Sequence, residues 1–538
     1  MTRQLHGPRR VPTPPRAGSI TGGALAGLVA WLALPLTLMP PPHAEPSQAW
    51  TLARADSLFP WLLACVVVGG ALGPVLETVP RKRAARRRVA MAAAGRRVVI
   101  LGGGFGGVAA ARRFEQAWRR APGLEVTLVS KTNYLLFTPM LSEVAAGSLQ
   151  PSSIGAPLRA TCPRTRYVRA EVVGLDPVER VVHVRSAAGV EPLPYDHLIV
   201  ALGSVAEVNV GGVAAHALPL KTLGDAVRLR EHVLAQLEQA DLTMDPEERR
   251  RLLTFVVAGG GFAGVEGIAG MTGLVRSVLG YYPRIRPGEP RFVLIHSRDR
   301  ILPDLEPELG DYAQAKLFSR GVELRLDSRV VAAGEGAVAL DNGELVPTRT
   351  LVWTTGNRPS PALAGLPLGN DGGAVLVDET LKVAGIDRVW AVGDCARVPD
   401  LRRGGSCPPT AQHALRQGKV VADNVLASMA GKRAKAFRFR TRGLLVALGH
   451  QTAAAQLRRV QVRGLPGWLL WRALYLSKLP GAEKRLRVLL DWIVGILFPR
   501  DTTLASDLPP QQAQRQGSTA GVAGTSRRGG RHARKRVA

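Results

Sequence analysis

Cysteine is rare in this sequence, and the few cysteines are far apart. The 538 residues contain four of them, Cys65, Cys162, Cys395 and Cys407, and no two form a CxxC or CxxxxC pair. Iron–sulfur clusters, structural zinc sites and dithiol relays therefore lack their usual ligands, and no metal site is expected. So few cysteines also give no sign of an oxidising compartment, which favours a body exposed to the cytosol.

Acidic residues are absent from three stretches of the chain. Residues 1–16, 81–97 and 508–538 contain four, eight and seven Lys or Arg and no Asp or Glu, and they hold 19 of the 29 excess positive charges. A net charge of +29 raises the question of a polyanionic partner such as nucleic acid or anionic lipid. Most of the excess charge thus lies in these three stretches. The length of 538 residues, at about 100 to 200 residues per domain, predicts two to four domains.

Two long runs near the N-terminus lack charged residues. Residues 20–39 and 58–76 are each about as long as one bilayer-spanning helix, which needs roughly 20 apolar residues. Basic residues flank the pair on both outer sides, so the positive-inside rule predicts a transmembrane hairpin with both ends in the cytoplasm. The alternative is a signal peptide ending near Ala44, although a second apolar run so soon afterwards argues against it.

Two shorter apolar segments, 468–476 and 486–497, lie near the C-terminus with several cations between and within them. Such segments are typical of amphipathic helices that lie in the headgroup plane of a membrane. Their cations, expected to contact anionic phosphates, are Lys478, Lys484, Arg485 and Arg487. An ordinary pair of core helices is the alternative. Six of the nine tryptophans lie in the suspected membrane segments, and this placement favours helices that contact the membrane. Residues 508–538 predict a solvated basic tail, for which nucleic-acid binding is not expected.

Glycine is abundant, and two groups of glycines form the same motif. The strand-like run 97–101 leads through Gly102, Gly104 and Gly107 into a helix-like segment. The pattern recurs 157 residues later, where the run 252–258 leads through three further glycines, Gly259, Gly261 and Gly264. In GxGxxG the glycines permit a tight turn, close approach of a pyrophosphate, and packing of helix on strand. Two copies in this context predict two dinucleotide-binding units.

Both units lack the acid that usually follows the second strand and holds the ribose hydroxyls. The second strand of the first unit ends at Ser130-Lys131, and that of the second unit ends at His296-Ser297-Arg298. At the second unit the missing carboxylate, with Arg298 nearby, leaves room for the 2′-phosphate of NADPH. NADH and NADPH therefore both stay open as the nucleotide.

The order of the motifs resembles that of flavoproteins with two dinucleotide-binding domains. Within that group the sequence resembles the type II NADH dehydrogenase family, which are single-chain NADH:quinone oxidoreductases bound to one membrane leaflet. Besides the two glycine motifs, the resemblance rests on Asn133 to Leu141, Tyr195-Asp196, Trp353 to Gly356, Gly393-Asp394 and Ala411 to Ala414. It covers about residues 96–500 and leaves the N-terminal hairpin and the basic tail as additions.

The resemblance implies an α/β fold with two Rossmann-like domains, as in glutathione reductase, and a role for particular residues. FAD would be held by Gly102, Gly104, Gly107 and Asp394, with Ser130, Lys131 and Gly356 as further cofactor-binding candidates. The nicotinamide nucleotide would be held by Gly259, Gly261, Gly264, Glu266 and Arg298. Glu266 is a catalytic candidate that would contact the nicotinamide ribose or carboxamide, although a carboxylate favoured by the helix dipole explains it equally well.

The sequence departs from the family at the motif beside the quinone, AQxAxQ. Gln412 matches the first glutamine, but Arg416 stands at the second, and glutamine is displaced to Gln417. Gln412 and Arg416 share one helix face and are the catalytic candidates on this side, whereas Gln417 lies about 140° from Gln412. The departure leaves the acceptor in question, and Arg416 facing solvent is the plain alternative.

These observations predict a non-pumping NAD(P)H:quinone oxidoreductase of the plasma membrane with a cytoplasmic catalytic body and a membrane quinone as partner. Anionic lipids of the inner leaflet are expected partners, and a homodimer is left open. Sulfide:quinone oxidoreductase is the alternative enzyme, and a non-catalytic flavin-binding redox sensor is the alternative outside catalysis. The predicted regions are the arm and hairpin 1–95, FAD domain 96–220 and 351–430, nucleotide domain 221–350, membrane-associating region 431–507 and tail 508–538.

Overall fold

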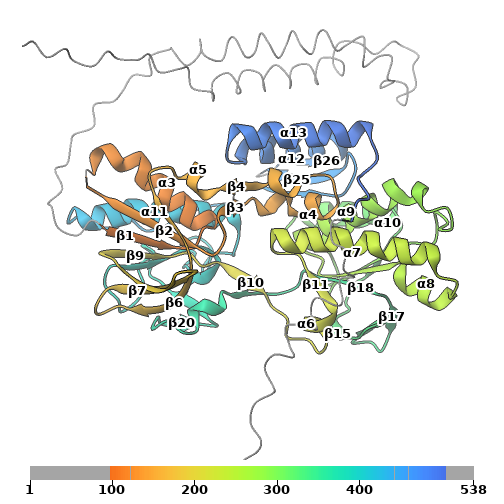
Figure 1. The fold of residues 1–538 in the computed structure, drawn as a ribbon, viewed down its shortest axis with the longest axis horizontal. Helices are drawn as coiled ribbons and strands as arrows, with labels where there is room; N and C mark the ends of the chain where they lie inside the picture. Colours follow the sequence, from red (N-terminus) through yellow and green to blue (C-terminus); the bar gives the residue numbers. More distant parts are fainter. Residues whose placement is uncertain (1–96, 122, 442, 458–459, 505–538) are drawn as a thin grey trace, which may run out of the picture.

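The computed structural model describes residues 97–121, 123–441, 443–457 and 460–504, and in these residues two α/β units lie side by side (Figure 1). The first unit is built on a parallel sheet of strand order β22-β9-β1-β2-β5. Its strands are β1 (Arg97–Leu101), β2 (Glu125–Ser130), β5 (Arg166–Arg169), β9 (His197–Val200) and β22 (Val389–Ala391). The central strands β1 and β9 are almost wholly apolar and buried, as expected of a parallel sheet covered on both faces.

The second unit repeats this plan with a parallel sheet of order β11-β18-β12-β13-β14. Its strands are β11 (Ala217–Pro219), β12 (Thr254–Ala258), β13 (Arg291–Ile295), β14 (Val322–Arg325) and β18 (Thr350–Trp353). Its helices are α7 (Leu223–Leu242), α8 (Pro246–Leu252), α9 (Phe262–Val278) and α10 (Pro307–Phe318). The predicted limits of this domain are 221 and 350. The sheet begins four residues earlier, with β11, and ends three residues later, with β18.

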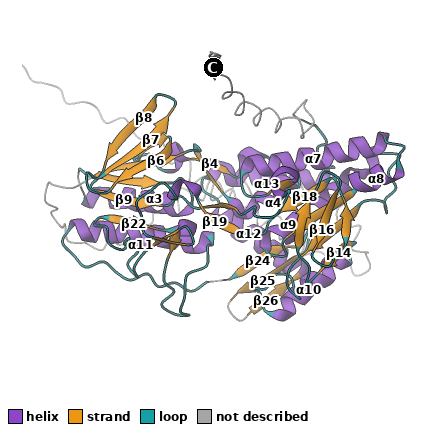
Figure 2. Cartoon of the chain, turned by 90° about the horizontal axis from the view of Figure 1, so that it is seen from below, coloured by secondary structure: helices purple, strands orange, loops and turns teal. Residues whose placement is uncertain are grey.

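In each unit the glycine motif opens the helix that follows the central strand. In the first unit this is α3 (Phe105–Ala117), which packs closely on α11 (Ala411–Met429). In the second it is α9. Each unit also carries a three-stranded antiparallel sheet, and the one in the first unit stands away from the parallel sheet in Figure 2. These sheets are β6 (Glu171–Asp176), β7 (Val181–Ser186) and β8 (Gly189–Pro194), and β15 (Val330–Ala333), β16 (Ala337–Leu340) and β17 (Leu345–Pro347).

Two short strands that connect the parallel sheets of the two units pair with each other. β10 (Ser204–Ala206) leaves the first unit, β19 (Asn357–Pro359) returns to it, and the two form an antiparallel ladder. The remaining short elements include β3 (Tyr134–Leu136), α4 (Leu141–Ala145), β4 (Gly155–Pro157), α5 (Leu158–Thr161), α6 (Val213–His216), β20 (Asn370–Asp371), β21 (Ala374–Leu376) and β23 (Ala396–Arg397).

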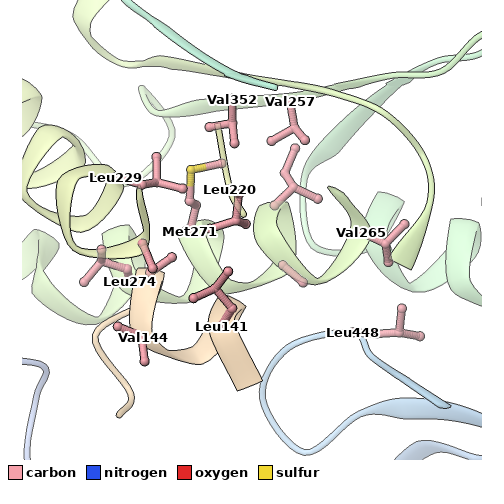
Figure 3. Close-up of a cluster of buried hydrophobic side chains, with 14 of the residues drawn as sticks. Leu141, Val144, Leu220, Leu229, Val257, Val265, Met271, Leu274, Val352 and Leu448 are labelled. Carbon is pink, nitrogen blue, oxygen red and sulfur yellow. The ribbon is translucent and has the colours of Figure 1, made fainter. Parts of the chain in front are cut away.

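The C-terminal region joins the core of the second unit and does not form a core of its own. It comprises β24 (Leu444–Ala447), β25 (Ala453–Leu457), β26 (Val460–Arg463), α12 (Gly464–Lys478) and α13 (Ala482–Leu497). One apolar cluster runs from α4 through α9 to this region, and Figure 3 shows Leu141 and Val144 of α4 facing Leu274 of α9. α12 and α13 lie along one side of the molecule above α4 (Figure 1).

The predicted hairpin at 20–39 and 58–76 and the basic tail 508–538 lie outside the described residues. Within those residues, one helical stretch is long and apolar enough to cross a bilayer, Phe262–Tyr281, and more than half of it is buried inside the protein. This stretch is α9 and the turn after it, the core helix that carries the second glycine motif.

Candidate functional site

The first glycine loop has no room for a side chain at its first and last glycines but is open at its middle glycine. Gly102 has a φ of +114°, and a Cβ added there would lie 2.1 Å from the carbonyl oxygen of Ala201. At Gly107 an added Cβ would lie 1.9 Å from the carbonyl oxygen of Gly102. At Gly104, by contrast, an added Cβ would meet nothing within 4 Å. The loop thus leaves open the position where a phosphate approaches the backbone and the free amides at the start of α3.

The second loop has the same geometry. Gly259 has a φ of +116°, and a Cβ on Gly264 would lie 1.8 Å from its carbonyl oxygen. Gly261, the counterpart of Gly104, again has nothing within 4 Å of an added Cβ. In each loop the first and last glycines of the motif leave no room for a side chain, whereas the middle glycine faces open space. Both loops therefore fit the pyrophosphate of a dinucleotide.

The strand ends beside the loops differ from each other. In the first unit Ser130 is buried, and Lys131 Nζ forms an ion pair with Glu171 at 2.7 Å. In the second unit the amide of Gly260 donates to Nδ1 of His296 at 3.1 Å, and Arg298 is exposed.

Asp394 lies at the crossing between the two units. Ser204 Oγ donates to Asp394 Oδ2 at 2.9 Å, and Lys221 Nζ donates to Ser204 Oγ at 3.1 Å and to Asn357 Oδ1 at 2.8 Å. Burial lowers the pKa of Lys221, and the charge of Asp394 partly restores it. Gly356 directly precedes Asn357 and has a φ of +68°, so it turns the chain at the same crossing. The sequence did not indicate Ser204 or Lys221.

A small cavity opens between Asp394 and the start of α11. It is lined by Gly393, Asp394, Ala396, Cys407, Pro408, Pro409, Thr410, His413, Ala414 and Gln417. Gln417 is buried, and its Oε1 accepts from the amide of Gly393 at 2.8 Å. From the sequence, Gln417 is interpreted as a glutamine displaced from the motif beside the quinone. In the structure it lies against Gly393-Asp394, whereas neither Gln412 nor Arg416 lines this cavity.

Gln412 and Arg416 instead contact the segment that leads into the C-terminal region. Gln412 Nε2 donates to the carbonyl oxygen of Gly443 at 2.8 Å. The guanidinium of Arg416 stacks 4.6 Å from the ring centroid of Phe439, which also packs edge-on against His413. The alternative that Arg416 simply faces solvent is wrong, because the side chain is half-buried on this ring.

Glu266 faces the C-terminal region. Its Oε1 accepts from the amide of Ala447 at 3.0 Å and from Trp471 Nε1 at 3.2 Å. Burial raises the pKa of Glu266 to about 8, and the hydrogen bonds offset only part of that rise. At neutral pH the carboxyl therefore holds a proton at the junction of α9, β24 and α12.

A second buried carboxyl, that of Glu143 in α4, lies in the same region. Its Oε2 accepts from Trp492 Nε1 at 2.8 Å, and burial raises its pKa. The guanidinium of Arg472 lies 3.8 Å from the ring centroid of Trp468 and 4.4 Å from that of Trp492. Burial lowers the pKa of Arg472 to about 10, while the charge of Glu143 opposes this.

These contacts correct part of the membrane interpretation. Trp471 and Trp492 are buried against the protein, so their placement does not indicate an interface with lipid. Lys484 is also buried, and its Nζ donates to the carbonyl oxygen of Ser152 at 2.6 Å. Arg487 pairs with Glu483 on the same helix at 2.8 Å. The sequence could not show that residues 484, 488 and 492 form the inner face of α13.

The opposite face of these helices is apolar and exposed. Leu486, Leu490 and Val494 recur every four residues along α13, and α12 adds Leu465 and Leu469. Each of these five side chains is at least two-fifths exposed. Leu497, the last residue of α13, and Phe498 directly after it extend the stripe.

Two family models match the chain, and between them they cover most of the described residues. Residues 96–418 match the pyridine nucleotide-disulphide oxidoreductase model, and residues 442–501 match the NDH2 C-terminal domain model. The type II NADH:quinone oxidoreductase NdhA of Mycobacterium tuberculosis is 34% identical over 405 residues, 71% of this chain and 84% of that protein. The chain belongs to the type II NADH dehydrogenase family.

Other relatives agree with this membership of the type II NADH dehydrogenases. A probable NADH dehydrogenase of Dictyostelium discoideum is 30% identical over 388 residues, 70% of this chain and 85% of its own length. The structure of NDH2 from Plasmodium falciparum in complex with NADH aligns with a TM-score of 0.69 at 19% identity, covering 76% of this chain and all of that chain. The α/β fold with two dinucleotide-binding units, predicted from the glycine motifs, is confirmed.

The cysteines of this type II NADH dehydrogenase are protonated and mostly buried in the described part of the chain. Burial raises the pKa of Cys395 to about 11 and that of Cys162 to about 12. Cys407 lines the cavity beside Asp394, and burial raises its pKa to about 11 as well. No group of three or more His, Cys, Asp or Glu in the described residues is arranged to hold a metal ion.

Proposed function

We propose that the protein is a membrane-bound, FAD-dependent NAD(P)H:quinone oxidoreductase that does not pump protons. The observation that carries this proposal is the pair of glycine loops that are sterically closed at both ends yet open at Gly104 and at Gly261. One chain of this family thus offers two pyrophosphate sites, which suits one tightly held cofactor and one exchangeable nucleotide.

The first unit is the proposed site of FAD. Gly102, Gly104 and Gly107, with the start of α3, would receive the pyrophosphate, and Ser130 and Lys131 lie where the adenosine ribose is expected. Asp394, fixed by Ser204 and adjoining the cavity at Gln417, suits a hydroxyl of the ribityl chain. Bound FAD would supply the redox chemistry, accepting a hydride from NAD(P)H and passing two electrons to the quinone.

The second unit is the proposed site of NADH or NADPH, held by Gly259, Gly261 and Gly264 at the start of α9. Glu266, one turn further along that helix, holds a proton at neutral pH because burial raises its pKa to about 8. Reduction of a quinone to a quinol consumes protons, and a carboxyl with a pKa close to the working pH is suited to supply one. Gln412 and Arg416 are proposed to act on the quinone side by holding the segment 439–443 in place.

The exposed apolar stripe of α12 and α13 is the proposed contact with the membrane. Leu465, Leu469, Leu486, Leu490 and Val494 would enter the acyl boundary, while the exposed cation Arg487 and its neighbour Arg485 lie near anionic headgroups. We place this face on the inner leaflet of the plasma membrane with the two nucleotide units in the cytoplasm, in keeping with the basic flanks of the chain.

The alternative of sulfide:quinone oxidoreductase is less well supported. That chemistry needs reactive cysteines, whereas burial raises the pKa of Cys162 to about 12 and the pKa values of Cys395 and Cys407 to about 11. A redox sensor would rest on the absent ribose acids alone, and the open second loop argues for a nucleotide there.

The test is an anaerobic titration of the membrane-extracted holoprotein with NADH and, separately, with NADPH, followed by a short-chain quinone. We expect the flavin absorbance to be lost with nucleotide and to return with quinone. Flavin that neither nucleotide reduces would contradict the proposal. Flavin reduced by sulfide alone would favour the alternative enzyme.

A further inference from the structure

The rim of the second glycine loop, residues 296–298, carries a cation and no carboxylate. These residues directly follow β13, at the position where a dinucleotide-binding unit usually places the acid that holds the ribose hydroxyls. Arg298 is exposed, and the described structure contains no ion pair between its guanidinium and a carboxylate. Positive charge at this rim is therefore available to a ligand.

The backbone of this rim is fixed by three backbone hydrogen bonds to the last residue of β14 and to the segment that follows it. His296 donates to the carbonyl oxygen of Arg325 at 2.8 Å, and Ser328 donates to that of His296 at 3.0 Å. Asp327 donates to the carbonyl oxygen of Arg298 at 3.1 Å. Because the main chain is fixed on both sides of Ser297, the position from which the Arg298 side chain extends is set before any ligand binds.

The His296 ring cannot replace the missing acid. Its Nδ1 accepts from the amide of Gly260, so in the neutral ring the proton is on Nε2. Burial and the nearby charge of Arg298 lower its pKa, against smaller opposing effects of the Arg300 backbone and of the charges of Asp299 and Asp327, and this favours the neutral ring. A ring with one nitrogen already accepting and the other protonated offers no acceptor to ribose hydroxyls.

The first unit differs at the equivalent position. Lys131 also follows its strand directly, but its ammonium pairs with Glu171 at 2.7 Å. The charge of that rim is already balanced, which suits the uncharged adenosine ribose of FAD. In the second rim Arg298 forms no ion pair within the described residues, which suits a ligand carrying one more phosphate.

We propose that the second unit selects NADPH over NADH, with Arg298 pairing to the 2′-phosphate of the adenosine ribose and Ser297 available to donate to it. This inference rests on the proposed function, since it names the electron donor of that reaction. Two exposed carboxylates, Asp299 and Asp327, lie near His296 and would repel the phosphate. Arg298 must outweigh them for the selection to hold.

The first experiment measures binding without redox chemistry. Adenosine 2′,5′-bisphosphate and 5′-AMP are titrated into the oxidised, full-length holoprotein by calorimetry. We expect the bisphosphate to bind about tenfold more tightly or better, because one charge-assisted hydrogen-bonding pair to phosphate is worth roughly that much. The advantage is expected to shrink as salt is added. Equal affinities, or tighter binding of 5′-AMP, would overturn the proposal.

Matched variants locate the effect. R298A is expected to abolish the preference for the bisphosphate while leaving 5′-AMP binding unchanged, and R298K is expected to restore part of it. R286A removes another exposed cation of the same unit, from the loop before β13 at the opposite edge of the sheet, and is expected to keep the preference. H296E is expected to reverse the preference. A preference that R298A leaves intact would contradict the assigned role of Arg298.

Steady-state kinetics then separate this inference from the proposed function. If the preference for the bisphosphate is present but no nucleotide supports quinone reduction, the function fails and the selection stands. If quinone reduction proceeds with a higher kcat/KM for NADH than for NADPH, the function stands and the selection fails. In R298A we expect the KM for NADPH to rise about tenfold with little change in kcat.

Discussion

The two glycine loops have nearly the same backbone conformation and the same steric limits, but the residues around them differ. Gly102 and Gly259 differ by two degrees in φ. A Cβ added to Gly107 or Gly264 would lie 1.9 or 1.8 Å from the carbonyl oxygen of the first glycine of its loop. The helix position five residues after the open glycine is Ala109 in one unit and Glu266 in the other. Ala109 is buried, and its Cβ would be only 2.9 Å from a Cβ on Gly418 of α11, whereas Glu266 reaches the C-terminal region.

This difference separates two kinds of requirement. A pyrophosphate needs backbone amides and space, so both units obey the same glycine rule. The ribose end, and whatever packs on the first helix, depends on side chains, so there the units diverge. The motif glycines thus indicate that a dinucleotide binds. The side chains around them indicate which dinucleotide it is and which part of the protein packs beside it.

The largest effect is expected where the two loops are alike. In G107A the new Cβ would lie 1.9 Å from a backbone oxygen, and in G264A 1.8 Å, so the strand and helix must move apart. We expect each variant to lose on the order of 3 kcal/mol or more of the free energy of unfolding, measured by denaturant titration. G104A is the control, because its Cβ enters open space. A G107A protein as stable as G104A would contradict the packing described.

The next effect tests the position at which the units differ, Glu266. Its carboxyl has an ordinary pKa near 4.5 and a native pKa of about 8, so between these values the native state binds more protons than the unfolded state. The free energy of unfolding should therefore fall, by a few kcal/mol in total, as pH rises from about 4.5 to 8. E266Q, neutral at every pH, should remove this part of the slope.

Denaturant titrations at pH 6 and pH 8 would measure that change in slope. The neighbouring titratable groups, Glu143 and Tyr475, remain in both proteins, so their contributions cancel to first order. E335Q removes an exposed carboxyl of the same unit and should leave the slope unaltered. An identical pH dependence in wild type and E266Q would show that the carboxyl is ionised in the native state.

A smaller effect distinguishes the ligands of the two loops. In G104A and G261A the added methyl occupies the space proposed for a pyrophosphate, so each variant should fold and weaken binding of its own ligand by roughly one to two powers of ten. G104A should be purified with little flavin. G261A should retain flavin yet need far more NAD(P)H to reduce it. If both lost flavin equally, the assignment of one ligand to each unit would be wrong.

The sequence predicted the elements that obey local rules. The glycine loops, the strands before them and the two C-terminal helices follow from periodicity and backbone sterics, which neighbouring residues determine. It did not predict the contacts made across long separations, such as Glu266 with Trp471, 205 residues apart, or Ser204 with Asp394, 190 residues apart. Tryptophan content alone could not separate the inward-facing Trp492 from a lipid-facing residue, because only packing against α4 decides it.

The smallest effect concerns α11, the helix of the first unit that packs on α3. Q417L would leave the Gly393 amide without its acceptor, at a cost of about 1–3 kcal/mol, and should release flavin because Gly393 precedes Asp394. R416A would remove the stacking contact with Phe439, worth about 0.5–1 kcal/mol, and a long hydrogen bond to the carbonyl oxygen of Gln412, and it should keep its flavin. Flavin content and denaturation midpoints of the two variants decide the order. A greater loss of flavin in R416A than in Q417L would indicate that Arg416 contacts the cofactor and that Gln417 contributes to packing alone.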